Sequence, residues 1–238
     1  MSSYGRFLVL VVAAVVFGVP EHGQARDWFA GGQAALQKAK KLKPVEGRAR
    51  NVILFVGDGM GVSTVTAARI LEGQLQGHSG EENQLAFEQL PYLALSKTYS
   101  VNQQTPDSAP TMNAMMTGVK TNDGIFGVSE AVKRKETRWS VVNSNRLMSL
   151  LELAELRGLS TGVVTTARLT HATPAACYAH TSERDWESDA DQPFDTDVPD
   201  IARQLVEFPF GDGLEVAMGG GRRAFLPESA TDGEGRKG

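Results

Sequence analysis

The chain has 238 residues, 41% of them hydrophobic, and carries a formal net charge of −4 at pH 7. This length and apolar content are enough for one large domain or two small ones. A nucleic-acid-binding protein usually carries a basic excess, so the slightly acidic balance argues against that class and predicts no nucleic-acid partner.

Residues 1–25 have the pattern of a secretory signal peptide. Arg6 gives a positive start, residues 7–19 form a continuous apolar run, and small residues follow at 23–25. A bilayer span takes ~20 apolar residues, so this run predicts export rather than a stable membrane span. We therefore expect a periplasmic or secreted protein, with a polar lead-in at residues 26–47 around a short helical pattern at residues 30–41, and the main domain at residues 48–238.

The main domain alternates apolar segments with helical patterns. Its expected strands are residues 51–56, 93–101, 161–166 and 214–218, and its expected helices are residues 62–76, 108–116, 143–157, a segment from 173 and 199–208. Alternation of this kind predicts an α/β fold with a largely parallel central sheet and helices on both faces. One cysteine, Cys177, excludes an intrachain disulfide.

Reactive side chains follow three of these segments, and in open α/β sheets sites gather at the carboxyl ends of strands. The first is Asp58, in the run Gly-Asp-Gly-Met-Gly at residues 57–61. A carboxylate between glycines suits a hard cation, because the backbone can approach the ion closely. The alternative is a polar turn whose aspartate caps the next helix.

The second candidate is Ser108, at the expected start of a helix, where backbone N–H groups and the helix dipole favour a phosphate-like anion. A plain capping serine is the alternative. A serine nucleophile needs an activator, and the four histidines are all distant from Ser108 in sequence. Ser108 does not lie in a G-x-S-x-G elbow, so activation of its hydroxyl by a metal is the more economical hypothesis.

The third segment contains His171 and Thr173, which are two residues apart and could face one site from an extended loop. A neutral histidine suits zinc, and a hydroxyl oxygen suits magnesium. Arg184 follows, and its guanidinium can bind phosphate at two points. Taken alone, Arg184 could equally be a solvated surface arginine.

Together these segments resemble the alkaline phosphatases, in order and in spacing, from about residue 48 to residue 226. The matching stretches are residues 51–61, 106–109, 117–121, 162–166, 171–175, 178–181, 186, 188–191 and 219–222. The resemblance implies an alkaline-phosphatase-like fold and the hydrolysis of phosphate monoesters through a phosphoserine. It also implies zinc and magnesium as cofactors and a homodimer as the assembly.

The resemblance also implies a role for each candidate residue. Asp58 is similar to the carboxylate that bridges a zinc and a magnesium, and Thr173 to a magnesium ligand. Ser108 is similar to the serine that becomes phosphorylated and whose alkoxide a zinc stabilises. Asp107 is similar to the neighbour that orients the phosphate-clamping arginine, here Arg184.

His171 stands where family members carry either aspartate or histidine, so the resemblance places it near magnesium, in contact with the ion through water. The family's remaining metal ligands come from segments beyond the matched ones, and no histidine follows His180. We therefore expect a partial domain, incomplete at its C-terminal end, that is inactive or weak by itself.

Two rival functions remain open. One is another reaction of the same superfamily, such as that of a phosphodiesterase or a sulfatase, although the C/S-x-P-x-R context of a sulfatase lacks its arginine here. The other is a non-catalytic protein that binds phosphate or metal with the same side chains.

Overall fold

The computed structural model describes residues 27–43, 46–231 and 235, so the expected signal peptide lies outside the described residues. The described residues divide into two units, one within residues 27–50 and 86–93 and the other within residues 51–85 and 94–235. Within the described ranges, no helix combines the length and the apolar character needed to cross a membrane.

The first unit contains helix α1 (Trp28–Lys41) and the 3-10 helix η1 (Ala86–Gln89). Asp27 caps α1 by accepting a hydrogen bond from the backbone N–H of Ala30 at 3.0 Å. The helix buries none of its side chains, and three lysines in its last turn complement the negative end of its dipole. The helical pattern predicted at residues 30–41 is thereby confirmed.

The second unit holds all the candidate site residues. Its helices are α2 (Val62–Leu75), α3 (Ser108–Thr117), α4 (Trp139–Ser144), α5 (Leu150–Glu155), α6 (Ala172–Ala175) and α7 (Ile201–Val206), with 3-10 helices η2 (Asp189–Asp191) and η3 (Arg222–Phe225). Its strands are β1 (Gly162–Arg168) and β2 (Val216–Gly220).

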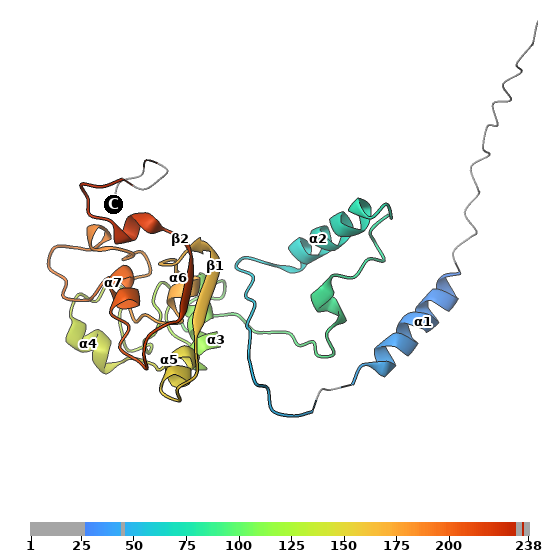
Figure 1. The fold of residues 1–238 in the computed structure, drawn as a ribbon, viewed down its shortest axis with the longest axis horizontal. Coiled ribbons are helices and arrows are strands. Elements are labelled where there is room, and N and C mark those ends of the chain that lie inside the picture. Colours follow the sequence, from blue (N-terminus) through green and yellow to red (C-terminus); the bar gives the residue numbers. More distant parts are fainter. Residues whose placement is uncertain (1–26, 44–45, 232–234, 236–238) are drawn as a thin grey trace, which may run out of the picture. The chain divides into compact units, whose positions relative to one another are not determined.

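β1 and β2 lie side by side and run parallel (Figure 1). Gly162 pairs with Val216 and Val164 with Met218, after which the register shifts so that Arg168 pairs with Gly220. The helices between the two strands make the long crossover that a parallel pair requires. The α/β class and the parallel pairing predicted from the sequence are confirmed.

Two of the predicted strands are wrong: residues 51–56 and 93–101 are not strands in the structure. Val52 and Phe55 are 86% and 90% exposed, and Leu95 is 96% exposed. Within the described residues the sheet contains β1 and β2 alone, so neither segment has a neighbouring strand to complete its hydrogen bonds. An apolar run predicts burial, but it does not specify a pairing partner.

Several helix boundaries differ from the sequence expectation. The helix expected at residues 143–157 is shorter: α4 ends at Ser144, and Ser149 caps α5, which begins at Leu150. The helix expected from residue 173 begins at Ala172 with His171 as its N-cap, and α7 begins after Asp200, which accepts a hydrogen bond from the N–H of Arg203.

Two buried clusters hold the second unit together. The larger joins α3, α5, β1, α6 and α7 through residues that include Met112, Phe126 and Ile201. The smaller gathers Ile125 and Trp186 with buried valines from the loops and from α4. Ile125 and Phe126 are adjacent yet belong to different clusters, so their segment runs between the two cores and is fixed by both.

Ser149 is a buried helix cap, and its loss is expected to destabilise the fold. Its hydroxyl accepts a hydrogen bond from the N–H of Glu152 at 3.1 Å and donates one to the carbonyl of Cys177 at 2.7 Å. Ser149→Ala should lower the free energy of unfolding by about 1–2 kcal/mol, measured by urea denaturation. Ser144→Ala, at an exposed serine, is the control; equal effects of the two variants would contradict the role of the cap.

Candidate active site

Ser108 is the first residue of α3, and its position follows from the turn before it. Asp107 is the N-cap: its carboxylate accepts a hydrogen bond from the N–H of Ala109 at 2.6 Å. Pro110 falls in the first helical turn, where the N–H that proline lacks would have no intrahelical partner. The Ser108 hydroxyl is therefore held at a helix N-terminus, next to groups that favour an anion.

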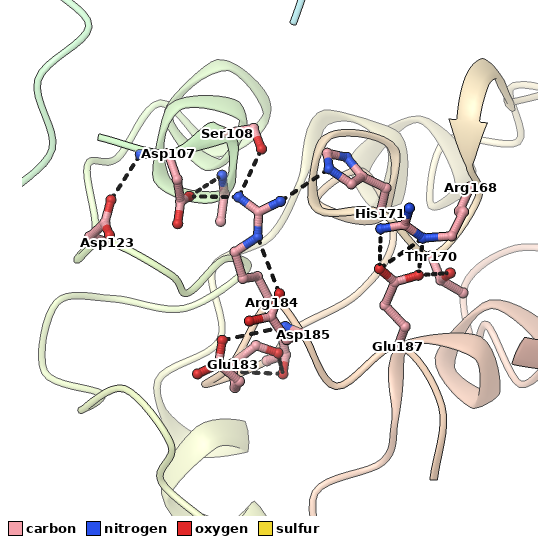
Figure 2. A network of polar contacts seen from close by, with 12 residues as sticks. Asp107, Ser108, Asp123, Arg168, Thr170, His171, Glu183, Arg184, Asp185 and Glu187 are labelled. Carbon is pink, nitrogen blue, oxygen red and sulfur yellow. Dashed lines mark hydrogen bonds and ion pairs between the residues drawn. The ribbon is translucent and has the colours of Figure 1, made fainter. Parts of the chain in front are cut away.

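Arg184 is the centre of the site (Figure 2). One terminal nitrogen donates to Ser108 Oγ at 3.0 Å and lies 3.3 Å from Asp107 Oδ1, and the other donates to His171 Nε2 at 3.1 Å. Its side chain is 18% exposed. Two segments, the turn of Asp107 and Ser108 and the residue His171, thus converge on one guanidinium, and the surface-arginine interpretation of Arg184 is wrong.

His171 caps α6 and is half-buried beside Arg184. Arginine has no acceptor, so His171 Nε2 accepts and the ring proton is on Nδ1. Burial, followed by the charges of Arg184 and Arg168, lowers the pKa of His171 below its ordinary value. The lowered pKa favours the neutral ring, whose acceptor nitrogen, Nε2, is the one that receives the hydrogen bond from Arg184.

Asp58 and Thr173 meet, although they are far apart in the chain. The Thr173 hydroxyl donates to Asp58 Oδ2 at 2.7 Å, and the same oxygen lies 3.9 Å from His171 Nδ1. The six residues predicted for the site thus form a continuous set, from Asp58 through Thr173, His171 and Arg184 to Asp107 and Ser108.

The donor set fits part of a cation site. Asp58 and Thr173 offer oxygen ligands of the kind that magnesium prefers, whereas the N–H at His171 Nδ1 is buried without a hydrogen-bond partner. An unpartnered buried N–H next to a carboxylate is explained by a water between them that accepts its proton. Over the part of the chain that the structure describes, no group of three or more His, Cys, Asp or Glu is placed to hold a metal.

A second group of side chains around the site was missed by the sequence reasoning. Glu187 is buried, and it accepts hydrogen bonds from Arg168 at 2.6–3.0 Å and from the Thr170 hydroxyl at 2.5 Å (Figure 2). Burial alone would raise the pKa of Glu187, but these donors outweigh it and hold the pKa below its ordinary value. The pair fixes the loop that leads from β1 into His171.

Comparisons with known proteins show the family of this chain. A family model described as alkaline phosphatase matches residues 49–238. The tissue-nonspecific alkaline phosphatase of Mus musculus is 46% identical over 235 residues, covering 95% of this chain and 44% of the relative. The alkaline phosphatase of Gadus morhua is 47% identical, with coverages of 90% and 45%. The chain belongs to the alkaline phosphatase family.

Solved structures of alkaline phosphatases match the fold of this chain. The alkaline phosphatase of Thermus thermophilus matches with a TM-score of 0.56 at 28% identity, over 84% of this chain and 36% of that one. A cold-active alkaline phosphatase from Shewanella sp. matches with a TM-score of 0.53 at 28% identity, over 72% and 36%. The fold is of the alkaline phosphatase type, and the chain spans less than half the length of these relatives.

Proposed function

We propose that this chain carries the nucleophile and the phosphate clamp of a phosphate monoester hydrolase. The observation that supports the proposal most directly is the contact between Ser108 Oγ and Arg184, 3.0 Å apart at the N-terminus of α3. A nucleophilic oxygen, a two-point phosphate donor and a helix terminus then face one small volume.

In the proposed reaction Ser108 Oγ attacks the phosphorus of a monoester. The bond from the serine oxygen to phosphorus forms as the bond to the leaving oxygen breaks, and the serine proton passes to solvent at alkaline pH. Arg184 holds two phosphate oxygens while charge redistributes, and Asp107 keeps its guanidinium in place. Water then cleaves the phosphoserine, releasing phosphate and restoring the hydroxyl.

Zinc and magnesium are the proposed cofactors. Asp58 and Thr173 would hold magnesium, with His171 close to the ion, and Asp58 and Ser108 would face zinc. When bound, these cations lower the pKa of oxygen nucleophiles and neutralise the charge of the leaving oxygen.

The proposal also includes export of the protein from the cytoplasm and a homodimeric assembly. A membrane-bound alkaline phosphatase of Bombyx mori, 44% identical over 90% of this chain and 40% of its own length, supports a non-cytoplasmic location.

Trapping a phosphoserine tests the proposal directly. The chain is incubated with zinc, magnesium and p-nitrophenyl phosphate, quenched in acid and digested for mass spectrometry. Because turnover by this partial domain is expected to be weak, we expect phosphate to accumulate slowly on the peptide that contains Ser108, and none in Ser108→Ala. Ser144→Ala, at an exposed serine on α4, should label like the wild type.

The outcomes separate the rivals. Phosphate binding in calorimetry without any labelling would favour the non-catalytic binding protein and contradict the proposal. Faster turnover of bis-p-nitrophenyl phosphate than of the monoester would favour a phosphodiesterase.

A further inference from the structure

The turn at Asp123 and Gly124 touches both halves of the candidate active site. Asp123 Oδ1 accepts a hydrogen bond from the backbone N–H of Asp107 at 2.9 Å (Figure 2). The carbonyl of Gly124 accepts one from the backbone N–H of Arg184 at 2.8 Å. Asp123 therefore holds the turn before Ser108, and its neighbour Gly124 holds the main chain of Arg184.

The turn is itself fixed on several sides. The N–H of Asp123 donates to Asn102 Oδ1 at 2.8 Å. Gly124 is buried with a φ of +78°, and a Cβ there would lie 2.4 Å from Arg134 Nε. That guanidinium cannot yield freely, because it makes two hydrogen bonds of 2.8 Å to the buried carboxylate of Glu183.

The backbone continues this connection beyond the turn. Phe126 and Thr181 exchange hydrogen bonds of 2.9 and 3.3 Å in an antiparallel bridge, three residues before Arg184. Phe126 is fully buried in the larger core. The segment carrying Arg184 is thus attached at Gly124 and at Phe126, whereas the segment carrying Ser108 joins the same turn through Asp123.

We propose that Asp123 is a positioning residue that, together with Gly124, sets the distance between Ser108 Oγ and the Arg184 guanidinium. Asp123 reaches the nucleophile only through the backbone of Asp107. The inference rests on the proposed function, because the distance matters only if a phosphate is bound between the two groups. Without the Asp123 acceptor, the N–H of Asp107 loses its partner and the first turn of α3 is free to shift relative to Arg184.

The chemistry of the bond predicts which replacements succeed. The N–H of Asp107 needs only an acceptor at this position, so an asparagine oxygen can replace the carboxylate oxygen. Alanine cannot. Asp123→Asn should therefore retain the geometry that Asp123→Ala loses, although both remove the charge. Recovery by asparagine separates positioning from an electrostatic effect of Asp123.

Two measurements on the full chain test the proposal. Calorimetry with inorganic phosphate, in zinc and magnesium, gives the phosphate Kd. Amide hydrogen exchange, followed by mass spectrometry, reports on peptides covering residues 105–112 and 181–188. Asp195→Ala, at an exposed aspartate, is the matched control. Thermal melting identifies any variant that fails to fold, and Asp123→Val, which also lacks a side-chain acceptor, then replaces Asp123→Ala.

We expect Asp123→Ala to weaken phosphate binding roughly tenfold to a hundredfold and to accelerate exchange in residues 105–112. Asp123→Asn and Asp195→Ala should stay within about threefold of the wild type. An unchanged Kd in Asp123→Ala, whatever its exchange, would overturn the positioning role. If the wild type binds no phosphate, the proposed function fails, and hydrogen exchange alone then tests the positioning role of Asp123. Unchanged exchange in residues 105–112 of Asp123→Ala would overturn that role, and faster exchange would support it.

Discussion

Arg184→Ala is expected to slow phosphoserine formation and to raise the phosphate Kd by roughly a hundredfold to a thousandfold. Arg184 contacts Ser108, Asp107 and His171 with its two terminal nitrogens, so alanine removes the donors that would hold two phosphate oxygens. Acid-quenched labelling measures the first effect, and calorimetry with inorganic phosphate measures the second.

The matched variants sharpen this result. Arg184→Lys should recover little of the loss, because an ammonium group is a point charge and cannot donate from a planar fork. Arg203→Ala, at an exposed arginine of α7 that pairs with Glu207, should behave like the wild type. If lysine restored full labelling, charge alone would suffice and the two-point clamp would be wrong.

Glu152→Ala is expected to lower the free energy of unfolding by about 3–5 kcal/mol. The Glu152 side chain is 1% exposed, and it accepts hydrogen bonds from Arg146 and from the N–H of Ser149. Glu152 Oε1 also lies 2.7 Å from His180 Nε2, and His180 Nδ1 lies 2.6 Å from the carbonyl of Gly127. Removing the carboxylate leaves the buried partners without their acceptor.

Urea denaturation at pH 7 measures this loss. Glu152→Gln should cost less than Glu152→Ala, because its amide oxygen still accepts a hydrogen bond. Glu130→Ala, at an exposed glutamate, should change the free energy of unfolding by about 0.5 kcal/mol or less. Equal losses for Glu152→Ala and Glu130→Ala would contradict the buried network.

The pH dependence of the same network has a definite sign. Burial would raise the pKa of Glu152, but His180, Ser149 and Arg146 outweigh it and hold the pKa below its ordinary value of 4.5. A carboxyl of this kind stabilises the fold above pH 4.5, and the stabilisation is lost as the pH falls through the lowered folded-state pKa. The difference in stability between the wild type and Glu152→Gln should therefore shrink on acidification. A constant difference from pH 7 to the acid limit would contradict this assignment.

The residues that the sequence singled out for the site lie together in the structure, whereas part of the predicted sheet is absent. Asp58, Ser108, His171, Thr173 and Arg184 were each singled out by residue type and by local context, and all of them converge in the structure. The strands predicted at residues 51–56 and 93–101 were wrong, because pairing depends on a neighbouring strand that no local pattern specifies.

By itself, the sequence determined the chemistry available to this protein: a serine at a helix start, an aspartate among glycines, and a histidine and a threonine two residues apart. These are local properties, set by the composition of short segments. Only the tertiary structure decided which neighbours support them. Asp123, Glu187 and Glu152 resemble any other acidic residue in the printed sequence, and they became informative once folding had buried them or brought them to partners from distant segments.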